Sequence, residues 1–287
     1  MKWYTKYLTV YEKKFDTISP IIVDEIRDNI HRLQNANPLA TVSVIAYNEE
    51  KHLLSCLWSL SEMKCKYPIE IIGVDNDSKD KTADVFRTLD IPFYTEKQHS
   101  CGFARSCGLA HAKGKFHINI DADTLYPPYY IETMIEALSK DNIVAVSSLW
   151  SYFPDKEHPA LGLKFYELTR DIYLFLQSFK RPELSVRGLV FAYHTELARS
   201  IGIRTEIIRG EDCSLALELK KYGKIKFIRN RKARAVTGYG TVAADGSLFN
   251  SFKKRAIKGL KHFTALFYSK NRYEDQDSNL INPGNRN

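Results

Sequence analysis

Two aspartates one residue apart, Asp121 and Asp123, end the alternating apolar stretch HINIDADT at residues 117–124. In an extended segment, side chains two positions apart point the same way, so both carboxylates can converge on one site. Hard oxygen ligands suit Mg²⁺ or Mn²⁺, which proteins often hold with one or two carboxylates and the phosphates of a substrate. An ordinary solvated acidic turn is the more common origin of an isolated pair. The pair alone leaves both interpretations open.

A polar loop follows an apolar run at residues 74–82, VDNDSKDKT, and Asp75 and Asn76 are its first polar residues. Such residues are normal turn formers and helix caps. The functional interpretation is that one or two of these side chains hydrogen-bond a nucleobase and a ribose.

Arg105 lies in the stretch GFARSCGLAHAKG, a predicted helix that is otherwise rich in Gly and Ala. Small residues let a helix approach a sheet closely, and an arginine there can present donors to a diphosphate or a base. A helix-surface arginine is the structural alternative.

Glu211 and Asp212 begin the predicted helix GEDCSLALELKKYG. Acidic residues at this position interact favourably with the helix dipole. The chemical alternative is that Asp212 acts as a general base in a partly desolvated cleft.

These residues follow strand-like segments in a chain that alternates strand and helix patterns from residue 41. The predicted strands are TVSVIAY, IEIIGVD, IPFYT, KFHINID and NIVAVSSLW. Successive strand–helix repeats need crossover connections, which predicts an α/β fold with a mostly parallel, Rossmann-like sheet covered by helices on both faces. Open α/β sheets bind ligands at the carboxyl ends of their strands, where the polar loops lie. The second half is less regular.

Three regions are predicted along the chain: an N-terminal helical appendage (1–37), a main domain (38–247), and a C-terminal part (248–287). The C-terminal part combines a basic amphipathic helix over 248–268 with a polar tail. Such a helix either packs on its own domain or rests on an anionic membrane surface.

The 287 residues carry a net charge of +8 at an isoelectric point near 9.1, which favours anionic partners. No recognisable nucleic-acid reader motif is present, so nucleic acid is not expected as a partner. The five cysteines show no zinc-finger or disulfide spacing. Without a run of about 20 apolar residues or a signal-peptide core, the expected location is cytoplasmic, with peripheral contact to the inner face of the membrane as an option.

Taken together and in this order, VSVIAYNEE, VDNDSKDKT, GFARSCGLAHAKGKFHINIDADT and GEDCSLALELKKYG resemble the motifs of glycosyltransferase family 2, over about residues 41–240. The resemblance implies a GT-A fold and inverting transfer of a sugar from a nucleotide-sugar. It also implies a divalent metal, Mn²⁺ or Mg²⁺, and a less regular acceptor-side half.

The resemblance assigns roles residue by residue. Ala46, Tyr47 and Glu49 match the first nucleotide-binding loop, and Asp75 and Asn76 match the base-binding position. The remaining matches are Arg105 near base and phosphates, Asp121 and Asp123 as the DxD element with Asp123 the more direct metal ligand, Asp212 as the general base, and Glu211 beside the acceptor.

The chain also departs from the family pattern. It has Asn76 where an aspartate is frequent, which removes the usual carboxylate partner of uracil, and Ile45 where a proline is common. After the fourth motif it reads VTGYG instead of an arginine-containing signature. The base of the donor and the acceptor-side contacts therefore do not carry over.

The expected function is a metal-dependent transferase in cell-surface polysaccharide synthesis that uses a nucleotide-sugar, with a UDP-sugar favoured, and a glycan or lipid-linked acceptor. A catalytically silent module that binds glycan or nucleotide is one alternative. A nucleotidyltransferase is another, although AYNEEKH lacks the glycines of a phosphate loop.

Overall fold

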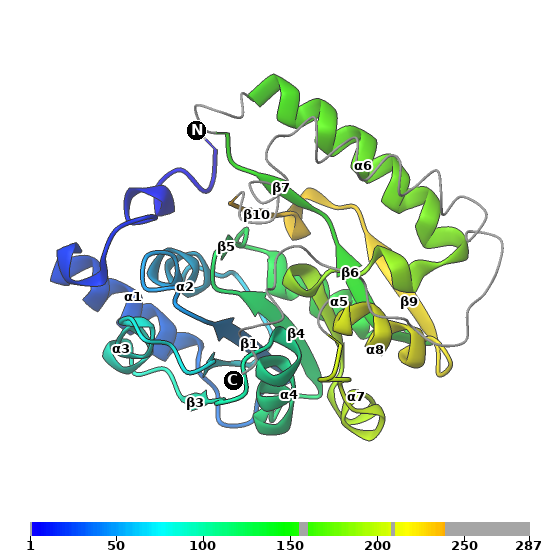
Figure 1. Ribbon diagram of the computed structural model, residues 1–287, viewed down its shortest axis with the longest axis horizontal. Helices are drawn as coiled ribbons and strands as arrows, with labels where there is room; N and C mark the ends of the chain where they lie inside the picture. The colour runs from blue at the N-terminus through cyan, green and yellow to red at the C-terminus, as the bar shows by residue number, and fades with distance from the viewer. Residues whose placement is uncertain (1, 155–159, 208–209, 239–287) are drawn as a thin grey trace.

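The computed structural model describes residues 2–154, 160–207 and 210–238. Over these residues the chain forms an α/β fold in which a twisted sheet runs through the centre and helices cover both of its faces (Figure 1). The basic helix predicted over 248–268 and the polar tail lie outside the described residues.

The large sheet has seven strands in the order β3–β2–β1–β4–β8–β6–β9. These are β1 (Ala40–Ala46), β2 (Ile69–Asp75), β3 (Phe93–Thr95), β4 (Phe116–Asp121), β6 (Ile143–Ser148), β8 (Phe191–His194) and β9 (Lys224–Ile228). Four of the neighbouring pairs are parallel, and β8 runs antiparallel between β4 and β6. The prediction of a mostly parallel sheet is confirmed.

Two apolar cores lie on opposite faces of this sheet. The larger one takes its side chains from α1 (Pro20–Leu33), α2 (Leu53–Ser61), α3 (Thr82–Thr88) and α5 (Tyr130–Leu138). The smaller one lies under α4 (Cys101–His111), α7 (Thr195–Ile201) and α8 (Glu211–Leu219). Within α4, Gly108 lies so close to β1 that an added Cβ would be 2.2 Å from Oγ of Ser43. The small residues of α4 therefore let this helix lie directly on the sheet.

A second, small sheet adjoins the main one near the DxD pair. It has the order β5–β10–β7, with β5 (Thr124–Leu125), β10 (Ala235–Thr237) and β7 (Trp150–Tyr152). Because β5 begins directly after Asp123, its pairing with β10 fixes the turn that carries the DxD pair.

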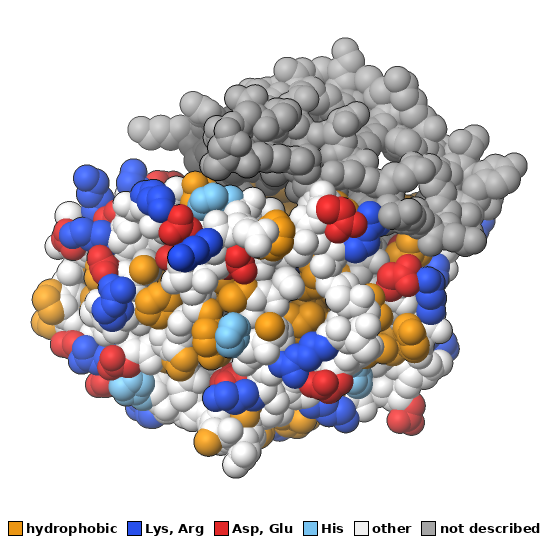
Figure 2. All heavy atoms as spheres, turned by 60° about the horizontal axis from the view of Figure 1, so that its bottom comes forward, with side chains coloured by type: hydrophobic (Ala, Val, Ile, Leu, Met, Phe, Trp, Pro, Cys, Tyr) orange, Lys and Arg blue, Asp and Glu red, His pale blue; other side chains and the backbone are white. Residues whose placement is uncertain are grey.

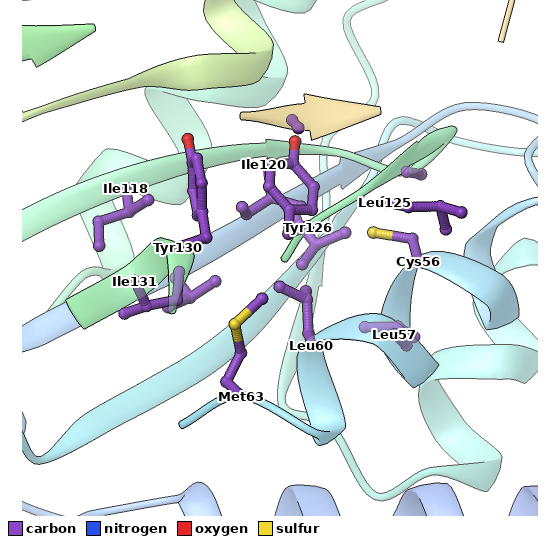
Figure 3. Close-up of a cluster of buried hydrophobic side chains, with 14 of the residues drawn as sticks. Cys56, Leu57, Leu60, Met63, Ile118, Ile120, Leu125, Tyr126, Tyr130 and Ile131 are labelled. Atoms are coloured by element: carbon purple, nitrogen blue, oxygen red, sulfur yellow. The ribbon is translucent and has the colours of Figure 1, made fainter. Parts of the chain in front are cut away.

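The core beneath that turn is dense. Figure 3 shows side chains of α2, among them Leu57 and Leu60, gathered with Ile120 of β4 and with Tyr126 just beyond β5. All four side chains are fully buried. The turn therefore rests on closely packed apolar side chains, which have little room to shift.

Helix α6 (Ala160–Lys180) has a different character, because one of its sides is apolar and exposed. That side carries Leu161, Phe165, Leu168, Ile172, Leu176 and Phe179, which are 51–83% exposed. None of the helices in the described ranges is long and apolar enough to cross a membrane.

The N-terminal segment packs onto the main sheet's larger core. Tyr7, Val10, Ile26 and Ile30 are buried in that core with α2. The division at residue 37 remains a prediction.

Candidate functional site

The polar loops meet at one edge of the large sheet. Strand β1 pairs Ala46 with Asp75 of β2 on one side and Ile45 with Asp121 of β4 on the other. All three strands are parallel, so their carboxyl ends lie together, as they do in the ligand sites of open α/β sheets.

Arg105 of α4 connects two of the motifs that the sequence singled out. Its Nη2 donates to Oδ1 of Asp121 at 2.9 Å, and its Nε lies 3.3 Å from Asp212 and 3.5 Å from Glu211. The side chain is only 4% exposed. Residues far apart in the chain therefore form one buried charge cluster.

This cluster keeps Arg105 charged. Burial opposes the positive charge, but the three carboxylates outweigh burial and hold the pKa of Arg105 above its ordinary value. Among the described residues, its Nη1 atom has no hydrogen-bond partner although it is buried. A buried guanidinium donor without a partner is costly, so a ligand acceptor is the natural complement of this atom.

Asp212 sits beside Arg105 and is supported from beneath. Its Oδ1 accepts from Nδ2 of Asn119 at 3.4 Å, and the Tyr193 hydroxyl donates to Oδ1 of Asn119 at 3.3 Å. Burial raises the pKa of Asp212 above its ordinary value, while Arg105 acts in the opposite direction. The carboxylate is therefore a stronger base than an exposed aspartate, and its orientation is fixed from the sheet.

Gly188 makes this arrangement possible. A Cβ at this position would lie 1.9 Å from Nη2 of Arg105 and 2.4 Å from Oδ2 of Asp212. The side chains of Arg105 and Asp212 occupy the space that a side chain at position 188 would need.

Asp123 lies at the same sheet edge, near the carboxylates of Asp121 and Glu49. Burial raises its pKa to about 7, and the negative charges of Asp121 and Glu49 add to this effect. Thr124 donates to Oδ1 of Asp123 at 3.0 Å, which partly offsets the rise. The charge of His52 also opposes the rise, but within the described residues no ion pair joins Asp123 to a cation as Arg105 is paired with Asp212.

The residues around Asp123 fit a divalent cation. The described part of the chain holds no cluster of three or more His, Cys, Asp or Glu side chains placed to bind a metal by themselves. Two carboxylates two residues apart match the sites of Mg²⁺ and Mn²⁺ that are completed by waters and substrate phosphates. Asp123 and Asp121 are the side chains that would hold the ion.

The first two predicted nucleotide loops are joined by hydrogen bonds between their backbones and side chains. The amide of Asn76 donates to the carbonyl of Ala46 at 2.9 Å, and the amide of Glu49 donates to Oγ1 of Thr82 at 2.7 Å. Asp75 is buried and accepts from the amide of Ser78 at 3.2 Å. These contacts hold the ends of β1 and β2 in one rigid frame.

Tyr47 is the exposed member of this frame. Its ring is half exposed, and its centroid lies 5.1 Å from that of His99. The two rings are tilted by 58° to each other, so the exposed face of Tyr47 alone is the surface on which a base can stack.

Asn76 has its amide turned away from such a ligand. Its Nδ2 donates to the carbonyls of Glu96 and Gln98, both at 2.8 Å. A carboxylate at this position could make neither bond, which is a physical reason for the departure from the family pattern. The structure places Asn76 as a support of residues 96–98.

Comparison with known proteins identifies the family. The model of the family described as glycosyl transferase family 2 matches residues 41–201, which is more than half of the chain. The chain belongs to glycosyl transferase family 2. An uncharacterized glycosyltransferase of Rickettsia prowazekii is 30% identical over 177 residues, which cover 60% of this chain and 55% of that relative.

Two solved structures share the GT-A fold of this family member. A mannosyltransferase of Pyrobaculum calidifontis, in complex with GDP-Man and Mn²⁺, has a TM-score of 0.57 at 20% identity and covers 83% of this chain and 72% of its own. Glucosyl-3-phosphoglycerate synthase of Mycobacterium tuberculosis, with Mn²⁺, UDP-glucose and phosphoglyceric acid, has a TM-score of 0.50 at 20% identity, covering 72% and 73%. At this identity the likeness establishes the fold.

Several residues that contact or support the predicted site residues were not singled out by the sequence patterns. They are Tyr11, His52, Asn119, Tyr126, Gly188 and Tyr193. Asn119 gave a usable signal, because a polar residue interrupts the apolar positions of a buried strand. Tyr126, whose hydroxyl accepts from the amide of Asp121 at 3.1 Å and donates to the carbonyl of Leu189 at 2.8 Å, looked like an ordinary core aromatic.

Proposed function

We propose that this protein is an inverting, metal-dependent glycosyltransferase that moves a sugar from a nucleotide-sugar to a hydroxyl of a glycan or lipid-linked acceptor. The observation that carries the proposal is the pair of largely buried carboxylates of Asp123 and Asp212 at one sheet edge. Asp123 has the acidic neighbours Asp121 and Glu49, whereas Asp212 has the guanidinium of Arg105 at 3.3 Å. One suits a metal, and the other suits a proton acceptor.

In the proposed reaction, the acceptor oxygen attacks the anomeric carbon from the face opposite the diphosphate. The bond between that carbon and the phosphate oxygen breaks, and its electron pair leaves with the nucleoside diphosphate. Asp212 takes the acceptor proton as the new bond forms. A carboxylate is a weak base towards an alcohol, so proton transfer must be concerted with bond formation, and the raised pKa of Asp212 helps it.

Arg105 has two tasks in this scheme. It holds Asp121 and Asp212 in fixed positions, and its Nη1 is available to a donor oxygen. A divalent metal held by Asp123 and Asp121 would supply positive charge for the diphosphate. Because these groups are held before substrate arrives, little reorganisation is needed during the reaction.

The donor is expected to bind along the frame of β1 and β2, with its base near Tyr47 and Asp75. A UDP-sugar is the first choice, but GDP-sugars belong in the test because Asn76 does not offer the usual carboxylate. A role in cell-surface polysaccharide synthesis and a cytoplasmic site of action follow from the same proposal. Charges of both signs are interspersed over the face in Figure 2, which gives no single-sign surface for nucleic acid.

The test is hydrolysis and binding of UDP-, GDP- and dTDP-sugars with Mn²⁺ or Mg²⁺. We expect metal-dependent binding of one nucleotide by calorimetry and slow hydrolysis of the corresponding sugar donor. Binding without turnover, even when acceptors are supplied, would favour the silent binding module. No nucleotide binding with either metal would overturn the proposed function.

A further inference from the structure

The N-terminal segment, which precedes the residues matched by the family, reaches the DxD turn. Tyr11 donates from its hydroxyl to the backbone carbonyl of Asp123 at 3.1 Å. The same ring packs on His52 and on Phe153, with centroids 4.6 Å and 5.0 Å away. The Tyr11 hydroxyl also lies close to Gly238, because a Cβ added at that glycine would be 2.8 Å from the hydroxyl oxygen.

The next residue, Glu12, reaches the first nucleotide loop. Its carboxylate lies 3.0 Å from Nε2 of His52, and Nδ1 of His52 lies 2.6 Å from Glu49. Burial opposes charge on His52, but the bonds to Glu49 and Glu12 outweigh it and raise its pKa to about 9. At neutral pH this is a charged bridge between the N-terminal segment and a predicted donor-binding residue.

The backbone of Glu12 adopts an unusual conformation next to this bridge. Its φ is 63°, in the left-handed region that non-glycine residues seldom adopt. Its amide donates to the carbonyl of Lys51 at 3.0 Å. Such a conformation persists only where the surroundings impose it.

We propose that the N-terminal segment Trp3–Ile18 is part of the donor site: Tyr11 is a positioning residue for Asp123, and Glu12 positions Glu49 through His52. This inference rests on the proposed function for the roles of Asp123 and Glu49. The contacts of Tyr11 and Glu12 carry it independently of the family, because they come from residues before the matched range.

The proposed role of Tyr11 is to fix the backbone of a metal ligand. Removing a group that orients a metal ligand from behind commonly weakens metal binding. The Tyr11 hydroxyl serves as the donor in this contact, at 3.1 Å from the carbonyl of Asp123.

The test compares Tyr11→Phe with Tyr7→Phe. Both remove one hydroxyl from the same segment, because the Tyr7 hydroxyl donates to Glu62 at 2.8 Å, away from the DxD turn. We expect Tyr11→Phe to weaken Mn²⁺ binding in the presence of UDP or GDP about three- to tenfold, the range of one hydrogen bond. Tyr7→Phe should leave this affinity unchanged.

Hydrogen exchange gives a readout that needs neither metal nor activity. In Tyr11→Phe, exchange should rise in peptides that cover residues 121–126, whereas in Tyr7→Phe it should rise only near 55–62. Unchanged exchange at 121–126 would overturn this inference even if the protein proves to be a transferase. If exchange at 121–126 rises but the protein binds no nucleotide, the positioning of the turn by Tyr11 is supported. The proposed function is then overturned instead.

Discussion

Asp123 and Asp212 are both largely buried carboxylates at one edge of the sheet, but their surroundings differ. Asp123 has acidic neighbours in Asp121 and Glu49, and its backbone is held by Tyr11. Asp212 has Arg105 at 3.3 Å and the amide of Asn119 at 3.4 Å. Glu211 and Asp121 also lie near Asp212, so the contact with Arg105 is what distinguishes it from Asp123. Two aspartates at one sheet edge can therefore serve different chemistry because their neighbours differ.

The largest effect is expected from Asp212→Asn. Loss of the proton acceptor should lower the rate of sugar transfer about 10²- to 10⁴-fold, the usual contribution of a general base. Binding of donor and metal should persist, because the proposed metal ligand is Asp123 and not Asp212. Transfer is followed by chromatography of the product, and binding by calorimetry.

Glu211→Gln is the matched control for that substitution. Glu211 is next in the chain and lies 3.5 Å from the same Arg105 nitrogen. Its loss should slow transfer much less. Equal losses from the two variants would mean that the charge of the cluster matters and that Asp212 has no separate role.

Asp123→Asn tests the other side of the comparison. It should abolish metal-dependent nucleotide binding while making the metal-free protein more stable, because repulsion by Asp121 and Glu49 disappears. A rise in Tm of roughly 2–4 °C corresponds to about 1 kcal/mol in a protein of this size. Thermal unfolding without metal, followed by calorimetric titration with Mn²⁺ and UDP or GDP, measures both effects.

Asp212→Asn should raise Tm less in the same thermal measurement. Burial raises the pKa of this carboxylate too, but Arg105 opposes that rise and loses one of its partners in the variant. If Asp212→Asn raised Tm as much as Asp123→Asn, the contrast between the two carboxylates would be wrong.

Gly188→Ala tests the close approach of Arg105 and Asp212. The added methyl group would overlap both side chains, so we expect a loss of about 1–3 kcal/mol in the free energy of unfolding, typical of overpacking. Transfer should fall with it, because Asp212 must move. Urea unfolding and initial rates measure the two losses.

Gly162→Ala is the corresponding control on α6. A Cβ there meets nothing within 4 Å, so the substitution should stabilise the helix by about 0.5–1 kcal/mol. A loss at Gly162 as large as that at Gly188 would show that the close contacts at Gly188 are not the cause.

The sequence was sufficient for the order of the elements and for expecting several of the predicted site residues at one sheet edge. Strands and loops follow local patterns, and their parallel order brings Asp75 and Asp121 to neighbouring strand ends. The grouping of Arg105 with Asp212 also emerged, but only because the resemblance placed both motifs at one site. Their contact joins α4 to α8, which no local pattern specifies.

Tyr11, Gly188 and Tyr193 show where such reasoning ends. Tyr11 belongs to a segment that looked like an appendage, and its bond to Asp123 spans 112 positions in the chain. Gly188 and Tyr193 come from the irregular half, where neither strand nor helix periodicity predicts neighbours. Their positions depend on packing between distant segments.

The smallest effect at neutral pH is expected at His117, which lies in β4 beneath Asp212. It is fully buried, stacks on Tyr193 with centroids 5.2 Å apart, and neither ring nitrogen has a hydrogen-bond partner within the described chain. Burial, with the charge of Arg105, lowers its pKa from 6.5 to about 3. The folded protein therefore keeps His117 neutral where the unfolded chain binds a proton.

Stability should consequently fall with pH below about 6.5, by about 1.4 kcal/mol for each pH unit, because only the unfolded state takes up this proton. The raised pKa values of Asp123 and Asp212 act in the opposite direction, so the comparison must be between variants. The free energy of unfolding of the wild type minus that of His117→Leu should shrink at this rate between pH 6.5 and 5, measured in urea. A difference independent of pH for His117→Leu would mean that His117 is protonated in the folded protein, and that the Asp212 side is less sealed from water than its contacts indicate.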